Sequence, residues 1–313
     1  ILAAWGEEKD QVPFVIDIGG TSAFSAANLN GQGYGLKRSV EAKLGTTYKQ
    51  GDVTTRFPTY NLPASADVYD FDMQMPVEEC ANMLVMFYAC LHFDKDTTFF
   101  AQNADLAAKW VGYLVDNGLR PANQLCTDDF AGHLANNLNL AVKATVGIAC
   151  YAELLRATGD KEGWAKYRKI AEDFASAITV FGDKFSHLPI TWDAGEETYS
   201  LKYNMAFDKI LGLSLFDKAV TEREVDFYLT KLNEYGVPLD NRKGYTKSDW
   251  LVWAASLTDD KAKQCKLIAS LDRYLRTSLE RIPFADWYET ETSLHHEFLA
   301  RSVQGGCFIL LLK

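Results

Sequence analysis

Apolar residues recur at helical spacing through most of the chain, beginning at Pro76. In the first such segment, Pro76 to Phe93, apolar positions lie three or four residues apart and proline stands at the first position. A last helix is predicted from about Leu299. The same spacing predicts seven helices between these two, over 97–117, 131–158, 161–181, 205–213, 218–235, 248–257 and 259–278. Helices joined alternately by short and long connectors predict helical hairpins, which close into an α/α toroid.

The first 72 residues have a different composition. They are rich in Gly, Ser, Thr and Asn and contain short β-like pieces such as "VPFVIDI" and "DVTTRF". We therefore expect an irregular β/loop-rich segment over 1–72 and a mainly α toroid over 73–313. A six-hairpin toroid needs twelve helices, two per hairpin, and only nine are predicted here. Either the N-terminal segment contains helices, or the toroid is incomplete and the chain is a fragment.

Composition and charge narrow the classes of partner. The chain has 313 residues, 48% of them hydrophobic, which is enough for one large core or two ordinary ones. A formal net charge of −10 with no basic stripe argues against nucleic acid. No run of apolar residues is long enough to span a bilayer, so we expect no membrane partner. The remaining expectation is a small-molecule substrate.

The cysteines do not predict a metal site or a disulfide framework. There are six in the chain, and they form no CxxC pair and no set with metal-ligand spacing. Several lie in apolar segments, where a thiol behaves as a small hydrophobic group. We expect neither a bound metal nor a cofactor.

The stretch "QLCTDDFAGH", residues 124–133, is dense in reactive groups. If a helix begins directly after Asp129, that residue is its N-cap and Asp128 lies just before it. His133 would then share one edge of the helix with Asn137. The stretch is either an acidic cap with solvated neighbours or a catalytic loop in which carboxylates, imidazole and amides converge.

Two more aspartates precede an aromatic residue near a long connector. "YTKSDWLVW" places Asp249 and Trp250 at the start of a helix, and "IPFADWYET" places Asp286 and Trp287 just before the last one. Long connectors gather at one end of a toroid, where carboxylates and aromatic faces suit a small polar ligand or a sugar. Alternatively, each aspartate caps a helix and each aromatic seals a hairpin. The catalytic candidates expected around one concavity are Asp128, Asp129, His133, Asp249 and Asp286.

Candidates for substrate binding come from several segments. A Lys or Arg near carboxylates can grip a substrate carboxylate, and Arg can do so with two hydrogen bonds. The same residues could instead form ordinary ion pairs between hairpins. The candidates are Glu79, Asn137, Lys202, Tyr203, Arg242, Trp250, Trp287 and Arg301.

Six motifs from about Met75 onward resemble the six-helical-hairpin domain of the fungal and bacterial glutaminase A family. They are "MPVEECANML", "QLCTDDFAGHLANNLNLAVKA", "LKYNMAFDKILGL", "YGVPLDNRKGYTKSDW", "RIPFADWYET" and "ARSVQGG", in the family's order. The resemblance implies a helical toroid of glycosidase-like type, secretion, and hydrolysis of L-glutamine to glutamate and ammonia. It also implies β-rich domains ahead of the toroid, which would be missing parts of the same protein.

Within this resemblance a mechanism can be sketched. Amide hydrolysis needs a base, donors for the oxyanion and an acid for the leaving ammonia. Glutamine also needs a carboxylate for its α-amino group and a cation for its α-carboxylate. Asp128 or Asp129 could be the base, and Arg242, Lys202 or Arg301 could hold the α-carboxylate.

Other functions stay open at this point. Cys126 and Thr127 could be nucleophiles, although Cys126 fits better as a residue packed under the loop. A helical toroid with paired carboxylates also suits a glycoside hydrolase acting on a carbohydrate. A third class is a catalytically silent helical module that binds a partner or assembles.

Overall fold

The computed structural model describes residues 75–126, 132–279, 283–296 and 298–312. These residues are mainly α-helical, as the apolar periodicity predicts, and the fold class is confirmed. The predicted β/loop segment over 1–72 lies outside the described residues, so the boundary at residue 72 stays a prediction.

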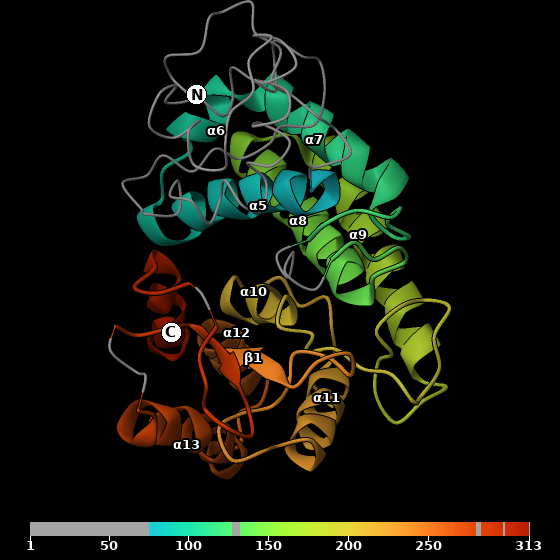
Figure 1. Cartoon of the computed structure of the whole chain (residues 1–313). Coiled ribbons are helices and arrows are strands. Elements are labelled where there is room, and N and C mark those ends of the chain that lie inside the picture. The colour runs from blue at the N-terminus through green and yellow to red at the C-terminus, as the bar shows by residue number, and fades with distance from the viewer. Residues whose placement is uncertain (1–74, 127–131, 280–282, 297, 313) are drawn as a thin grey trace, which may run out of the picture.

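Four helices form the inner layer of the fold. Their order in the chain is α5 (Pro76–Ala89), α8 (Leu138–Thr158), α10 (Met205–Ile210) and α12 (Ser248–Ala255). Most of their residues are buried: 10 of 14 in α5, 17 of 21 in α8 and 7 of 8 in α12. A helix that is apolar on all sides has to be surrounded by other elements. These helices follow one another around an arc in Figure 1.

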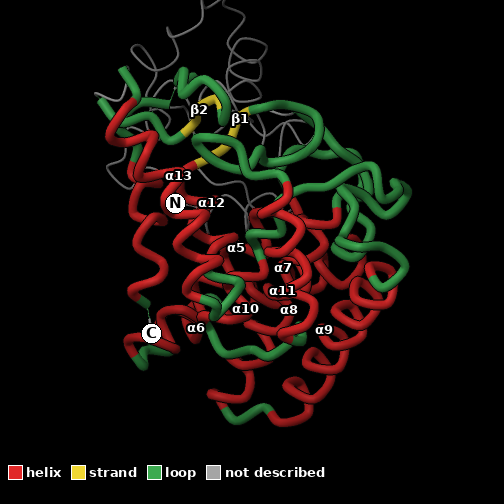
Figure 2. The backbone as a smooth tube through the Cα atoms, turned by 90° about the horizontal axis from the view of Figure 1, so that it is seen from below, coloured by secondary structure: helices red, strands yellow, loops and turns green. Residues whose placement is uncertain are grey.

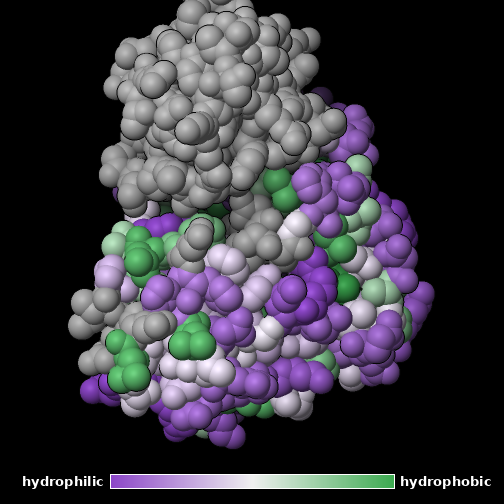
Figure 3. Space-filling model, viewed as in Figure 1, coloured by the Kyte–Doolittle hydropathy of each residue, from purple (hydrophilic) through white to green (hydrophobic). Residues whose placement is uncertain are grey.

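Four amphipathic helices cover the inner layer from outside. They are α7 (Ala104–Asn117), α9 (Lys161–Gly182), α11 (Lys218–Thr230) and α13 (Lys261–Thr277). Only 4 of 22 residues are buried in α9 and 5 of 17 in α13, as expected for helices that bury a single stripe. Hydrophilic residues cover much of the outer surface on the face shown in Figure 3.

Shorter elements complete the chain. The π-helical turn η4 (Cys90–Asp94) and α6 (Thr98–Gln102) link α5 to α7, and the 3₁₀ helix η6 (Ser302–Leu311) packs against α12. Strands β1 (Tyr245–Lys247) and β2 (Trp287–Glu289) form an antiparallel pair.

The connectors differ sharply between the two ends of the helices. Inner helices lead to outer ones through the short segments 159–160, 211–217 and 256–260. Outer helices lead to the next inner element through the long segments 118–137, 183–204, 231–247 and 278–301. Figure 2 shows both strands and much of the long connectors at one end of the helices. The N-termini of the inner helices therefore gather at that end, which we call the mouth.

Several predicted helix boundaries were wrong. The segment over 131–158 becomes helical only at Leu138, because Asn136 adopts a left-handed conformation (φ 57°) and Asn137 is the N-cap. The Asn137 side chain accepts a hydrogen bond from the Leu140 amide at 3.1 Å. The expected N-cap role of Asp129 in this helix was therefore wrong, as was the alignment of His133 on it.

The C-terminal prediction also needs correction. The last helix begins at Ser302, after the predicted start at Leu299, and it is a 3₁₀ helix. Asp286 and Trp287 precede this helix by a long connector, and Trp287 begins β2. The helix predicted over 97–117 is divided at Asn103, and the one over 218–235 ends at Thr230.

The prediction that no segment is long enough to span a membrane was wrong for helix α8. By length and composition it meets that requirement, but 94% of its apolar window is buried inside the fold. Its hydrophobicity is accounted for by contacts with α5, α9, α7 and α10. The expectation of no membrane partner stays a prediction.

Candidate active site

Two buried carboxylates and two cations meet at the N-terminus of α12. Lys247 forms an ion pair with Asp286, and its ammonium lies 3.8 Å from Asp249 Oδ1. Arg301 donates to both oxygens of Asp286, at 3.2 and 2.6 Å. Asp286 is fully buried, and Asp249 and Lys247 are only 3% and 1% exposed. We call these four residues the aspartate cluster.

The strand pair and a bent connector bring this cluster together. Pairing of β1 with β2 places Lys247 opposite Trp287, and the Ser248 amide donates to the Asp286 carbonyl at 2.9 Å. Phe298 has a φ of 75° in the connector that reaches η6. A positive φ is uncommon for a bulky residue, and such conformations cluster at functional sites. The Arg301 guanidinium lies 3.9 Å from the centre of the Phe298 ring.

The two aspartates differ in how far their oxygens are satisfied. Both oxygens of Asp286 accept charged hydrogen bonds. Asp249 Oδ1 is buried and has no hydrogen-bond partner among the described residues. A buried acceptor without a donor costs about 1–3 kcal/mol, and an exception of this kind in a native fold points to a role beyond stability.

An aromatic belt runs from the aspartate cluster across the inner helices. Its members come from α10, α12 and the connector that leads to α10, and they are Tyr203, Phe207, Trp250 and Trp253. Tyr203 stacks on Trp250 with ring centres 4.6 Å apart. Phe207 meets Trp253 edge-on at 5.0 Å. Lys247 lies over the Trp250 ring at 5.1 Å, so the belt begins at the aspartate cluster.

A second charged cluster lies at the other end of the belt. Lys143 of α8 lies over the Phe207 ring at 4.8 Å. Its ammonium is 3.2 Å from Glu78 and donates to Asn82 Oδ1 at 2.8 Å. The Asn82 amide donates in turn to Glu79 at 3.5 Å. Glu78, Glu79 and Lys143 are at most 5% exposed. Together with Asn82, we call these residues the glutamate cluster.

Two of the predicted binding residues have local structural partners. Lys202 is fully buried, and its ammonium donates to the Leu188 carbonyl and to both oxygens of Ser200, at 2.8 to 3.2 Å. Arg242 is bound to Asp240 of its own loop by Nε at 3.0 Å and by Nη2 at 2.6 Å. These contacts favour fixing the connectors over gripping a substrate, so the predicted binding roles lack support from the geometry.

The reactive stretch over residues 124–133 is only partly described. Asp128 and Asp129 lie outside the described residues. Gln124 accepts a hydrogen bond from the Val77 amide at 3.0 Å, which docks this connector on the first turn of α5. His133 is exposed in the connector before α8.

Neither described thiol near the mouth has the character of a nucleophile. Cys126 is 5% exposed, and the Asn137 amide donates to its sulfur at 3.5 Å. Burial raises the pKa of the Cys307 thiol, and the nearby Asp249 carboxylate raises it further. A thiol attacks as its thiolate, which this environment disfavours.

Trp287 packs outside the aspartate cluster. Its ring stacks on His296 at 4.2 Å, and Tyr245 meets it edge-on at 5.2 Å. His296 Nε2 lies 2.7 Å from Glu289, on the same face of the strand pair. Trp287 is thus part of the wall of the mouth formed by β1 and β2.

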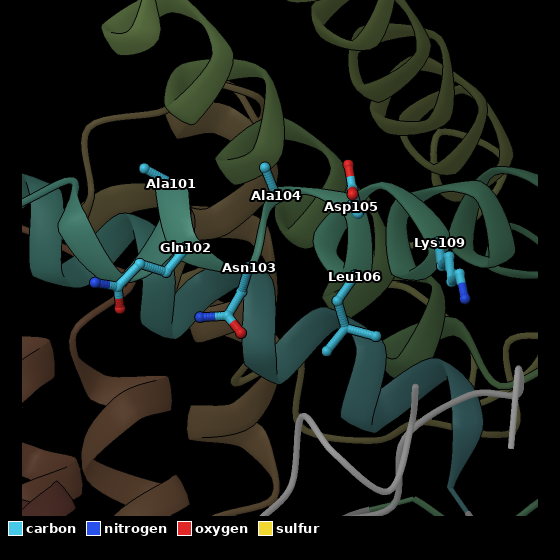
Figure 4. A pocket seen from close by; sticks show the side chains of 7 residues that line it. All are labelled: Ala101, Gln102, Asn103, Ala104, Asp105, Leu106 and Lys109. Atoms are coloured by element: carbon cyan, nitrogen blue, oxygen red, sulfur yellow. The ribbon is translucent and has the colours of Figure 1, made fainter. Parts of the chain in front are cut away.

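The described residues offer no candidate metal site, and a surface hollow among them lies outside the predicted site. No group of three or more His, Cys, Asp and Glu side chains among them could hold a metal ion. A surface hollow at the junction of α6 and α7, shown in Figure 4, has Asp105 and Lys109 as its charged residues. None of the predicted site residues lines this hollow.

The sequence did not point to two of the lysines. Lys143 lies in the second turn of the 21-residue helix α8 and Lys247 directly precedes α12, and neither was among the predicted site residues. The available signal for Lys143 was its place in an apolar run, since a buried lysine needs a charged or polar partner.

Comparisons with known proteins agree with this architecture. Glutaminase A from Aspergillus oryzae (strain ATCC 42149 / RIB 40) is 34% identical over an alignment of 277 residues that covers 86% of this chain and 39% of that protein. A probable glutaminase from Arthroderma benhamiae (strain ATCC MYA-4681 / CBS 112371) is 26% identical over an alignment of 366 residues, gaps included, that covers 88% of this chain and 42% of that protein. The chain therefore spans about two fifths of the length of these relatives.

The family model described as the glutaminase A six helical-hairpin domain matches residues 36–311. The match begins within the N-terminal segment, ahead of the first quoted motif, and ends in η6. Together with the inner and outer helical layers, this match shows that the chain belongs to the glutaminase A six-helical-hairpin family.

Proposed function

We propose that the protein hydrolyses L-glutamine to L-glutamate and ammonia, with its site at the mouth. The names of the two relatives support the reaction. The observation that supports the location is the buried, unpartnered Oδ1 of Asp249 beside the Lys247 ammonium. A carboxylate with an open oxygen next to a cation has the two functions that amide hydrolysis requires, a base and a donor.

In the proposed mechanism, Asp249 removes a proton from a water molecule that attacks the side-chain carbonyl carbon of glutamine. A C–O bond forms, and the Lys247 ammonium stabilises the negative charge on the carbonyl oxygen. The C–N bond then breaks, and the proton held by Asp249 passes to the leaving nitrogen to give ammonia. Asp286 and Arg301 hold Lys247 in place through the contacts within the aspartate cluster.

The test is ammonia release by wild-type protein and by Asp249→Asn. Asparagine keeps the shape and loses the charge, so turnover should fall by about two orders of magnitude or more. Asp240→Asn is a matched control, because that aspartate is equally buried but is paired within its own loop. Near-normal turnover in Asp249→Asn would remove Asp249 from the proposal.

The pair Asp128–Asp129 is the alternative source of the base. Asn at the position that faces the substrate should lower turnover by a similar factor with little change in melting temperature. Asp128→Asn and Asp129→Asn are therefore assayed beside Asp249→Asn. Loss of turnover in one of these variants alone identifies the carboxylate.

A glycan panel separates the proposal from the glycoside hydrolase alternative. Reducing-end release from glycans without ammonia release from glutamine would support a carbohydrate substrate. Failure of both, with a stable oligomer on sizing, would support a silent assembly module. Secretion and upstream β-rich domains are further predictions from the family resemblance.

A further inference from the structure

Asn204, like Asp249, has a buried side-chain oxygen to which no hydrogen-bond donor is directed among the described residues. The residue precedes α10 and is 1% exposed. Its side-chain amide donates to the Asn139 carbonyl at 3.0 Å, and its backbone amide donates to Asn139 Oδ1 at 3.4 Å. Asn204 Oδ1 has no partner within the part of the chain that the structure describes. Rotating the amide by 180° would place oxygen against the Asn139 carbonyl, so the donor contact fixes which atom is left open.

The position of Asn204 relates this oxygen to the proposed site. Asn204 directly follows Tyr203, and Asp249 directly precedes Trp250. Tyr203 and Trp250 are the stacked pair of the aromatic belt, with ring planes 10° apart. Asn204 and Asp249 both have a buried acceptor oxygen without a hydrogen-bond partner among the described residues, and each is one position away from the same ring pair.

The other side of Asn204 leads to the glutamate cluster. Asn204 and Phe207 lie three residues apart on one face of α10, and Lys143 lies over Phe207. Asn139 and Lys143 share a face of α8 in the same way, four residues apart. Asn204 thus lies between the two charged clusters, at the junction of α8 and α10.

An acceptor in this position selects for one chemistry. Leaving a buried carbonyl oxygen without a donor costs about 1–3 kcal/mol, which a ligand can recover only by supplying a hydrogen-bond donor. Carboxamide and ammonium groups carry N–H donors, whereas carboxylate and methyl groups do not. A site that leaves a polar group unpaired with the wrong ligand discriminates strongly against that ligand.

We propose that Asn204 is a substrate-binding residue whose Oδ1 accepts a hydrogen bond from an N–H group of the substrate. The inference rests on the proposed function and extends it, since it makes the site selective for a ligand bearing a carboxamide or an ammonium. Glutamine contains both groups, and the experiment distinguishes which of them Asn204 binds.

Calorimetric titration with three probes of similar length tests the proposal without requiring turnover. L-Norvaline carries the ammonium alone, 4-carbamoylbutanoate carries the carboxamide alone, and pentanoate carries neither. Wild-type protein is compared with Asn204→Ala. Binding of one N–H probe should weaken by about tenfold or more, corresponding to loss of one hydrogen bond, while pentanoate binding stays unchanged. The probe that loses affinity identifies the group.

Asn139→Ala is the matched control. It removes the Oδ1 that accepts from the Asn204 backbone but leaves the carbonyl that holds the Asn204 side chain. Its binding of all three probes should equal that of the wild type. Asn204→Leu, close in shape to asparagine, replaces the alanine variant if thermal melting shows that alanine disturbs the fold.

Three outcomes would overturn the inference: no binding of either N–H probe by the wild type, unchanged binding in the Asn204 variants, or an equal loss for pentanoate. An equal loss would show that Asn204 only shapes the mouth. Ammonia release from glutamine is measured in parallel. Its absence in the wild type, with the selective loss still present, would refute the proposed function and leave the N–H subsite standing.

Discussion

At the scale of single residues, Asp249 and Asp286 lie beside the same lysine but have different roles. Asp286 is fully buried and bound by two cations, whereas Asp249 keeps an open oxygen. Removing one partner of a buried ion pair leaves the other charge uncompensated. Asp286 therefore holds the cluster together, and Asp249 is available for a ligand.

This difference predicts unequal effects of the same substitution on stability. Asp286→Asn should lower the free energy of unfolding by about 3–5 kcal/mol, because Lys247 and Arg301 lose their buried counter-charge. Asp249→Asn should lower it by less, because Lys247 keeps Asp286 as its counter-charge and the 3.8 Å contact with Asp249 Oδ1 is too long to be a hydrogen bond. Urea denaturation of both variants measures the difference. Equal midpoints for the two variants would contradict this division of roles.

The sequence predicted those residues of the candidate site that stand in distinctive motifs. Asp249, Asp286 and Trp250 were predicted because an acid next to an aromatic recurs near long connectors. Lys143 and Lys247 were missed, since burial of a lysine depends on partners that are remote in the chain. Arg301 was predicted, but its contact with Asp286 depends on the bend at Phe298, which no periodicity encodes.

At the scale of helices, the apolar spacing predicted which segments are helical better than where they begin. Starts were wrong where a short polar side chain caps the backbone, as at Asn137. A close approach of two inner helices was likewise not predictable from the sequence. It occurs at Gly147 of α8, where a Cβ atom would lie 2.9 Å from both Cα and Cβ of Ala81 in α5.

Gly147→Ala should therefore force α5 and α8 apart and destabilise the protein by about 1–3 kcal/mol, the usual effect of overpacking. Gly112→Ala in α7 is the control, because nothing lies within 4 Å of the Cβ it would add. That variant should be more stable by about 0.5–1 kcal/mol, since alanine favours a helix over glycine. Thermal melting of the two variants should shift in opposite directions, and a rise for Gly147→Ala would show that the helices are not in tight contact.

At the scale of the whole molecule, the long connectors are tied to the outer layer as well as to the mouth. His187 in connector 183–204 stacks on Phe227 of α11 with ring centres 3.5 Å apart. Its Nε2 lies 2.8 Å from the Thr198 carbonyl. Burial lowers the pKa of His187 below its ordinary value of 6.5, partly offset by the Thr198 hydrogen bond, and the positive charges of Lys202 and Lys231 lower it further.

The sign of this pKa shift predicts acid sensitivity. Below pH 6.5 the imidazole is protonated in the unfolded chain before it is protonated in the fold, so stability falls as the pH drops through this range. Urea denaturation at pH 7.5 and 5.5 measures the loss. His187→Gln should show a smaller loss between these two values, because its side chain does not titrate. The same loss in both proteins would assign the acid sensitivity to other groups.

The unequal connectors have a consequence for how such a protein can diverge. Packing of α5 on α8 and of η6 on α12 depends on the helices, while the residues of the mouth come largely from the long connectors and the first turns that follow them. Insertions and substitutions at the mouth can therefore alter ligand preference without disturbing the core. Changes among the short turns at the opposite end would alter how hairpins close and leave the ligand untouched. Related domains should accordingly vary most in loop length at one end only.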